Sequence, residues 1–262
     1  IGTAADLSSQ LVITVADGAL LLGAGVLAGV VGTAGGITSL ISYPALLAAG
    51  VAPLPANVAN IVALVACWPG AALASRPELK GRAGWVARWS VLTAVAGLAG
   101  AALLLSTPTT VFGRVVPFLV AAGALALLLQ PKLSARRRPD RAHGSPMLLA
   151  GGVFLVSVYN GYFGAGAGVM TLALVLDTVD EHMARANALK NMLMGAATAG
   201  SAALLVVFAH VEWAAVVPLA VGLFAGSTIG PLVARRIPGT VLRWVVAFIG
   251  FALAVKLWLS PS

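Results

Sequence analysis

The chain has 262 residues, of which 60% are hydrophobic and only 9% are charged. So few charged residues exclude a soluble globular domain of this size, whose surface needs far more of them. The apolar runs recur at about 20 residues, enough for a helix to cross ~30 Å of hydrocarbon. They do not alternate with polar residues, as the strands of an outer-membrane barrel would. The composition therefore predicts an all-α, polytopic membrane protein.

Ten apolar segments follow one another along the chain, five in each half. The first half contains predicted helices at about 11–33, 37–50, 54–74, 85–105 and 109–130. The second half contains predicted helices at about 146–163, 166–177, 182–208, 213–234 and 239–259. The second segment of each half is too short to cross alone, which predicts half-helices or re-entrant pieces with their open backbone buried in protein. We expect a first membrane repeat at 1–130, a linker at 131–145 and a second repeat at 146–262.

The two halves resemble each other in sequence. A spacing of 130 residues separates Gly36 from Gly166, and the same spacing separates Asn57 from Asn187. Each half thus has a glycine-rich break, followed after about 20 residues by a polar pair at the start of its third segment. Two similar halves in one membrane chain are typical of transporters whose substrate site lies between the repeats.

Basic residues divide the linkers into two kinds. Lys and Arg concentrate in three linkers, at about 75–84, 131–145 and 235–236. Three others contain neither residue, at about 51–55, 106–110 and 209–212. If every segment crosses or half-crosses, the basic linkers share one side, which the positive-inside rule makes cytoplasmic. Equivalent linkers of the two halves then lie on opposite sides, which predicts inverted repeats. The net charge of +8 is explained by this topology, so nucleic acid is not an expected partner.

The glycine-rich breaks are the first candidate substrate site. A helix that begins just after Gly36 or Gly166 directs backbone N–H groups and the positive end of its dipole toward the break. Two such ends near the middle of the bilayer would bind an anion without a cofactor or a metal ion. The residues expected to contribute there are Thr33, Gly35, Gly36, Thr38, Tyr162, Gly164 and Gly166. The alternative is that the glycines only let helices cross, as the spacing of Gly25 and Gly29, or of Gly222 and Gly226, also indicates.

The polar residues that open the third and eighth segments are the second candidate. Asn57 and Asn60 share one helix face, and so do Asn187, Lys190 and Asn191. Lys190 lies roughly 13 Å along its predicted helix, where an ammonium group is costly unless it faces a partner or an aqueous cavity. No acidic residue is an obvious intramembrane partner, so a substrate anion would fit. The alternatives are snorkelling toward the interface and a tie to backbone carbonyls.

Other polar residues receive mainly structural interpretations. Cys67 is interpreted as a small packing residue, with a thiol role toward sulfur compounds left open. Asp17 is the one carboxylate of the first apolar stretch and is a weak candidate for proton coupling. A polar loop is expected to be solvated rather than to bind a metal; its residues are Asp177, Asp180, Glu181, His182 and Arg185.

The glycine breaks and polar pairs, in this order and spacing, resemble the TauE/SafE sulfite-exporter family. The resemblance rests on 29–37, 43–47 and 56–60 in the first half, and on 161–168 and 186–190 in the second. It covers nearly the whole chain. It implies a prokaryotic inner-membrane permease for sulfur-containing anions or small organic acids, such as sulfite, thiosulfate or sulfoacetate. The second repeat departs from the first, since Gly164-Ala165-Gly166 stands where the first has Gly35-Gly36, so the half-sites are expected to differ.

These observations predict a secondary transporter that binds a small anion between two inverted repeats and exposes it alternately to each side. The expected partners are the anion and the lipid bilayer, and a homo-oligomer stays open. An anion channel with the same site is the first alternative. A membrane-embedded enzyme is the second, although the chain shows no cluster of His and carboxylates on facing helices. A non-transporting anchor subunit is the third. The chain has no Walker A sequence, which argues against direct use of ATP.

Overall fold

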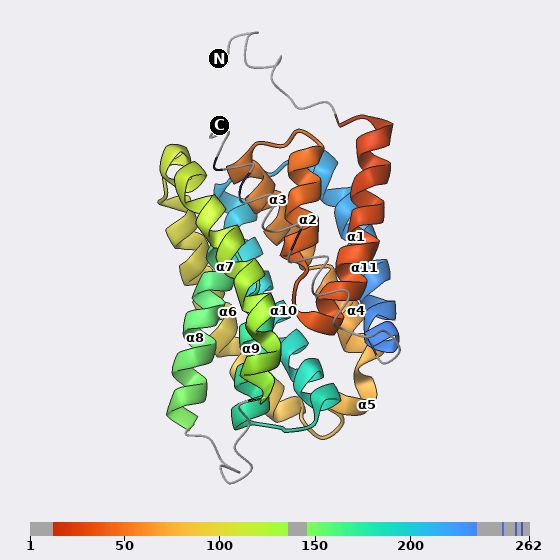
Figure 1. Ribbon diagram of the computed structural model, residues 1–262, viewed down its shortest axis with the longest axis vertical. Coiled ribbons are helices and arrows are strands. Elements are labelled where there is room, and N and C mark those ends of the chain that lie inside the picture. Colours follow the sequence, from red (N-terminus) through yellow and green to blue (C-terminus); the bar gives the residue numbers. More distant parts are fainter. Residues whose placement is uncertain (1–12, 136–145, 235–247, 249–254, 256–257, 259–262) are drawn as a thin grey trace.

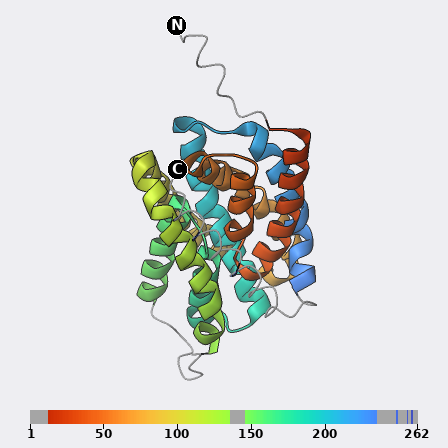
Figure 2. The ribbon, with the colours of Figure 1, turned by 45° about the horizontal axis from the view of Figure 1, so that its top comes forward.

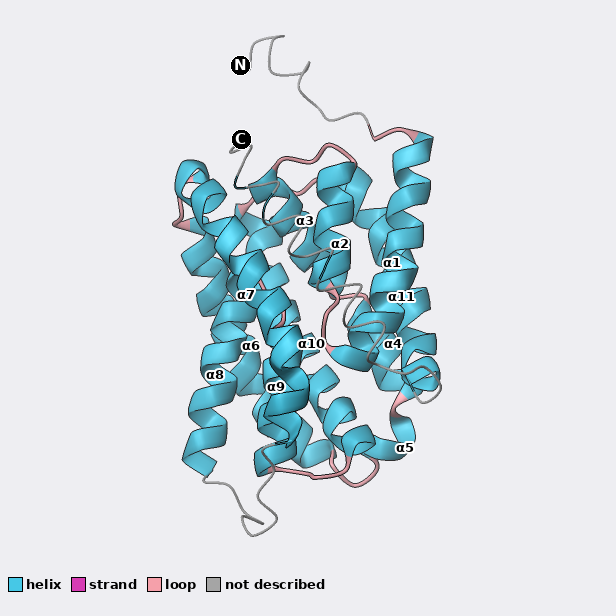
Figure 3. Ribbon diagram, viewed as in Figure 1, coloured by secondary structure: helices cyan, strands magenta, loops and turns pink. Residues whose placement is uncertain are grey.

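The computed structural model describes residues 13–135 and 146–234, and in addition residues 248, 255 and 258. Every regular element in this part of the chain is a helix (Figure 3). In chain order the helices are α1 (Val15–Gly35), α2 (Ser39–Ala48), α3 (Pro53–Leu64), α4 (Cys67–Ala74), α5 (Arg76–Leu79), α6 (Ala83–Leu105), α7 (Thr109–Ala135), α8 (Pro146–Tyr162), α9 (Ala167–Thr178), α10 (Met183–Phe208) and α11 (Trp213–Ala234). This confirms the predicted all-α fold class.

Six stretches within the described residues are long and apolar enough to cross a membrane. They are Val15–Gly35, Pro53–Ala74, Ala83–Leu105, Thr109–Leu129, Met183–Phe208 and Trp213–Gly230. The predicted segment at 54–74 is divided into α3 and α4, because Pro69 has no N–H to bond the carbonyl of Val65 one turn earlier. The chain there makes tighter bonds, such as Trp68 N–H to Val65 O at 3.1 Å. The predicted helix at 239–259 lies outside the continuously described residues.

The short second helices are half-helices, as the sequence predicts. With 10 residues in α2 and 12 in α9, each rises about 15–18 Å, roughly half of the hydrocarbon thickness. Figure 1 shows α2 in the upper half of the molecule and α9 in the lower half. Their starts meet, since a Cβ on Gly36 would lie 2.5 Å from the carbonyl carbon of Gly168. Both chain breaks therefore come together inside the bundle.

Packing between the two halves follows the repeat. α1 lies along α11, and α8 lies along α6, so the first helix of each half packs on the fourth helix of the other (Figures 1 and 2). Glycines allow this approach: Gly25 faces the backbone of Gly222. The third helix of each half also packs on the fourth helix of the other half. Gly70 packs on α11, and Gly200, 130 residues later, packs on α6. The expectation that spaced glycines let helices cross closely is confirmed for these pairs.

The helices α1 and α8 run in opposite directions. In Figure 1, α1 descends from the top of the molecule, and α8 ascends from the bottom. The short helix α5, which belongs to the basic linker at 75–84, and the end of α7 lie at the bottom. The turns at 49–52 and 106–108, which contain neither Lys nor Arg, lie at the top.

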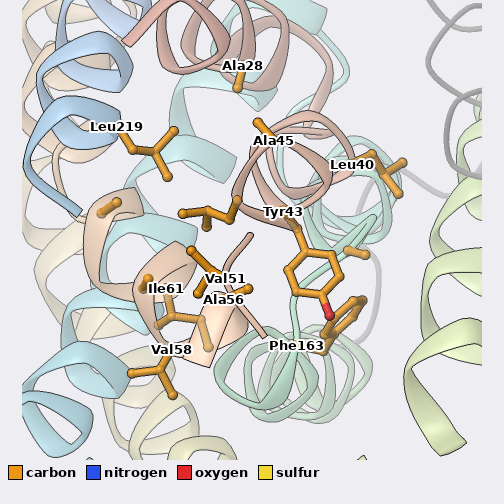
Figure 4. Close-up of a cluster of buried hydrophobic side chains, with 14 of the residues drawn as sticks. Ala28, Leu40, Tyr43, Ala45, Val51, Ala56, Val58, Ile61, Phe163 and Leu219 are labelled. Carbon is orange, nitrogen blue, oxygen red and sulfur yellow. The ribbon is translucent and has the colours of Figure 1, made fainter. Parts of the chain in front are cut away.

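Aromatic side chains hold the two breaks against each other. Tyr43 of α2 meets Phe163, which follows α8, with ring centroids 5.3 Å apart and an edge-to-face angle of 78° (Figure 4). Phe112 of α7 packs on Phe163 from another direction at 6.3 Å. All three rings are fully or almost fully buried. Edge-to-face pairs of this kind add to the burial of apolar area, so the cluster fixes where the half-helices begin.

Candidate functional site

A cavity of about 70 Å³ lies where the two breaks meet. Its wall is formed by the end of α1, the starts of α2 and α9, the α3–α4 region, α8 and the middle of α10. The lining residues are Gly32, Thr33, Gly36, Thr38, Ser39, Leu64, Cys67, Trp68, Ala71, Asn160, Gly164, Gly168, Lys190, Asn191, Met194, Gly195 and Thr198. At 10–15 Å³ for each water molecule, this space holds roughly five waters or one small anion.

The first break turns the chain from α1 into α2. Gly36 has φ +78° and donates its N–H to Gly32 O at 2.6 Å, a left-handed cap that glycine adopts without strain. The Thr38 side chain makes no capping bond, and the N–H groups of Thr38 and Ser39 bond no backbone carbonyl within the described chain. Thr38 and Ser39 both line the cavity. Thr33 differs, because its hydroxyl donates to Gly29 O at 2.6 Å.

The second break uses two left-handed glycines. Gly164 and Gly166 have φ of +82° and +77°, and the Tyr159 hydroxyl donates to Ala165 O between them at 2.7 Å. Gly164 lines the cavity. Gly166 faces α7 instead, where a Cβ would lie 3.1 Å from Gly123. Gly166 therefore serves the turn and its packing.

Two equivalent asparagines tie the repeats to each other. Asn57 of α3 donates through Nδ2 to Tyr162 O at the end of α8, and Asn187 of α10 donates to Thr33 O near the end of α1, both at 2.9 Å. Each third helix thus satisfies a last-turn carbonyl of the first helix of the other half. The Oδ1 atoms of both asparagines are buried and have no hydrogen-bond partner within the described chain.

Lys190 reaches the end of α1 from the wall of the cavity. Its side chain is 1% exposed, and Nζ lies 3.4 Å from Gly32 O and 3.5 Å from Thr33 O. Asn191 donates to the same Thr33 carbonyl at 3.1 Å. The last carbonyls of a helix have no partner within the helix, so they accept hydrogen bonds from donors such as these. The predicted tie to backbone carbonyls is therefore present, and the same side chain lines the cavity.

The other predicted site residues surround the cavity without lining it. Asn60, which occupies the place of Lys190 in the first repeat, accepts from Ser42 at 2.6 Å and donates to Ser39 at 3.3 Å. The residues of the prediction that line the cavity are Thr33, Gly36, Thr38, Gly164, Lys190 and Asn191. Those outside its lining are Gly35, Asn57, Asn60, Tyr162, Gly166 and Asn187.

Sequence reasoning missed one side of the cavity. Met194 and Thr198 follow Lys190 by four and eight residues, so helical spacing places them on its face, and Asn160 donates to Thr198 at 3.0 Å. Trp68 fills the space left by Gly195. Cys67, expected to be a packing residue, also lines the cavity, and its sulfur lies 3.9 Å from Leu223 O. This side presents indole, thioether and thiol groups.

An ion cluster joins the repeats at the lower end of Figure 1. The Asp180 carboxylate contacts Arg82 at 3.1 Å, Arg185 at 2.9 Å and the His182 ring at 3.3 Å. Burial raises the pKa of Asp180, but the His182 backbone N–H and the Arg185 guanidinium outweigh this effect and hold the pKa below its usual range. Among the described residues there is no group of His, Cys, Asp and Glu that could hold a metal ion. Asp17 caps the start of α1 by exchanging hydrogen bonds with Thr14.

These features define a multi-pass membrane protein with a cavity where the breaks of its two halves meet. The chain belongs to the sulfite exporter TauE/SafE family, whose family model matches residues 19–257.

Three relatives carry the name of probable membrane transporter proteins. YfcA of Escherichia coli K12 is 28% identical over 235 residues, covering 88% of this chain and 86% of its own. A Haemophilus influenzae protein is 28% identical over 243 residues, covering 91% and 93%. ORF9 of a Sinorhizobium species is 24% identical over 244 residues, covering 93% of each. No solved structure matches the chain. The family and these relatives establish the protein as a membrane transporter rather than an enzyme.

Proposed function

We propose that the protein is a secondary transporter that carries a small sulfur-containing or organic anion by alternating access, and that the central cavity is its binding site. The observation that carries this proposal is the position of Lys190. Its side chain lines the same cavity as Thr38 and Ser39 at the start of α2. A cation, hydroxyl groups and a helix N-terminus directed at one small space form an anion site.

The cavity, of about 70 Å³, has space for a small anion. Sulfite, thiosulfate and sulfoacetate are the candidates. The donors contributed by Thr38, Ser39 and Lys190 would contact the oxygens. Trp68 and Met194, which also line the cavity, would contact a less hydrated sulfur atom or carbon.

The arrangement of the halves supports alternating access. Each first helix packs on the fourth helix of the other half, and the first helices run in opposite directions (Figure 1). We infer inverted repeats at 1–130 and 146–262, joined by a cytoplasmic linker at 131–145. Such repeats can exchange conformations, which would open the same site to one side and then to the other.

Binding and flux of the purified protein test this proposal. Thiosulfate, sulfite, sulfate, sulfoacetate and acetate would be compared by thermal shift, because a ligand of the folded state raises the melting temperature. We expect Lys190→Met to weaken binding of the best anion about 10- to 100-fold, the range for a lost charge-assisted hydrogen bond. Lys80→Met, the same change at an exposed loop residue, is the matched control. Unchanged binding and flux in Lys190→Met would contradict the site.

Flux in liposomes separates a carrier from an anion channel with the same site. A carrier gives saturable flux that is stimulated by substrate on the opposite side. Currents far above carrier turnover would favour the channel.

A further inference from the structure

We propose that Lys190 binds a proton each time the cavity binds an anion, so that the proton is the coupling ion of transport. This inference rests on the proposed function, because it assigns the coupling ion to the same cavity.

The first argument is the lack of a counter-charge. Lys190 is 1% exposed, and the ion pairs of the described residues involve Arg82, His182, Arg185 and His210 but not Lys190. Outside the described residues the sequence adds only two acidic side chains, Asp6 and Asp140, in the N-terminal stretch and the central linker. An ammonium group buried in a membrane protein without an anion is costly. An empty cavity therefore favours the neutral amine.

The second argument is the geometry of the Lys190 nitrogen. It has two carbonyl acceptors, Gly32 O at 3.4 Å and Thr33 O at 3.5 Å. A neutral amine has two N–H groups, which these two acceptors match in number. An ammonium group forms shorter bonds, typically about 2.7–2.9 Å. Both distances lie at the long end for hydrogen bonds, as expected of a neutral amine rather than of an ammonium group.

Among the described residues, no carboxylate lines the cavity beside Lys190 and could take up the proton in its place. Cys67 of α4 is a titratable side chain that lines the same cavity. On the other elements packed against α10, Asp17 caps the start of α1, Tyr159 bonds Ala165 O, and Asp177 and Arg88 are exposed. Arg76 of α5 is exposed as well, and Glu78 of α5 has a partner of its own.

The coupling step balances in charge and atoms. The neutral amine of Lys190 takes one proton from water on the side to which the cavity is open, and the ammonium pairs with the anion. On the other side the anion leaves and the ammonium returns its proton to water. For a monoanion the loaded site gains no net charge, which removes the electrostatic penalty of crossing the bilayer. Asn60, the equivalent residue of the first repeat, cannot titrate, so we expect one proton for each anion.

Proton uptake on binding tests this inference directly. Thiosulfate is the probe, because it keeps the same charge near neutral pH and brings no proton of its own. Purified protein in a weakly buffered solution with a pH indicator should take up one proton for each thiosulfate bound. The apparent Kd should rise by up to about tenfold for each pH unit in the alkaline range, as linkage between the two ligands requires.

Lys190→Arg separates charge from titration. A guanidinium stays protonated, so this variant should bind thiosulfate without proton uptake and with a Kd that does not change with pH. Lys190→Asn copies the equivalent residue of the first repeat and should bind weakly, again without proton uptake. Lys80→Arg is the control and should keep the proton uptake of the unchanged protein. In liposomes, thiosulfate entry should acidify the lumen with the unchanged protein and not with the Lys190→Arg variant.

The outcomes distinguish the two proposals. Thiosulfate binding without proton uptake in the unchanged protein, or equal proton uptake in Lys190→Arg, would overturn proton coupling and leave the anion site standing. No stabilisation by any of thiosulfate, sulfite, sulfate, sulfoacetate and acetate would overturn the anion site and the coupling together.

Discussion

The starts of α3 and α10 occupy equivalent places in the two repeats, yet they differ in charge. Asn57 and Asn187 make the same cross-repeat bond at 2.9 Å. Three residues later, Asn60 bonds two serines within its own half, whereas Lys190 reaches carbonyls of the other half and the cavity. The first position therefore makes the same kind of contact in both halves. The second position differs, because only Lys190 brings an amino group to the cavity.

We expect the largest loss of stability from a side chain placed in the contact between the two glycine-rich breaks. Gly36→Val places a side chain at φ +78°, with Cβ 2.5 Å from the backbone of Gly168. Left-handed strain and overpacking together cost about 3 kcal/mol or more. We expect this variant to lose most of its folded, monodisperse protein on size-exclusion chromatography in detergent.

The neighbouring glycines provide graded controls. A Cβ on Gly35 meets only the Ile37 side chain, at 3.9 Å, and Gly35 does not have a positive φ. Gly35→Ala should therefore fold normally. Gly166→Ala keeps the left-handed strain but has its nearest contacts at 3.1 Å, so it should lie between the other two. Equal yields for all three variants would show that the breaks are not packed against each other.

The two cross-repeat bonds should differ in their contribution to stability. Asn57 is the donor to Tyr162 O, whereas Thr33 O accepts from Asn187, Asn191 and Lys190. Removing Asn57 would leave a buried carbonyl without this donor, at a cost of about 1–3 kcal/mol. We expect Asn57→Ala to lower the melting temperature clearly more than Asn187→Ala. The reverse order would contradict the assignment of Asn57 to the scaffold.

Much of the fold follows from the lengths of the apolar segments and the glycines that bound them. The positions of the half-helices α2 and α9 were predictable, since a run bounded by glycines and too short to cross must begin or end inside the protein. The division between α3 and α4 was visible in Pro69 but is hard to predict, because proline also kinks helices without ending them. The last predicted helix lies beyond the continuously described residues and stays a prediction.

The site was predictable only in part, for a physical reason. Lys190 and the glycines stood out in the sequence because they lie within apolar segments, where a charge or a break in a helix needs an explanation. The partner of a buried amide instead depends on which helix faces it. Asn57 and Asn187 look alike as candidate substrate ligands, and only the packing of each half on the other shows that their Nδ2 atoms bond carbonyls. Trp68 and Met194 gave no signal, because apolar side chains line cavities and lipid-facing surfaces alike.

The loops that precede α3 and α10 also differ between the two halves, and we expect the smallest change in stability there. Gly50 and Asp180 are separated by the same 130 residues. Gly50 turns the first loop with φ +84°, whereas Asp180 holds the second loop through Arg82, Arg185 and His182. The pKa of Asp180 lies below its usual range, so its stabilisation is present above the unfolded-state pKa of about 3.9. It is lost as the pH falls through the lower folded-state value.

Asp180→Asn should therefore lower the melting temperature near neutral pH and flatten its fall in acid. The partners are largely solvent-exposed, so the effect should be about 1 kcal/mol or less. Asp177→Asn, the same change at an exposed residue one turn earlier, should keep the slope of the unchanged protein. Thermal melts between about pH 3 and about pH 7 measure both variants across the range in which the carboxylate titrates. An acid slope in Asp180→Asn equal to that of the unchanged protein would show that the ion cluster does not hold the halves together, leaving the glycine contacts and the asparagine ties as their connection.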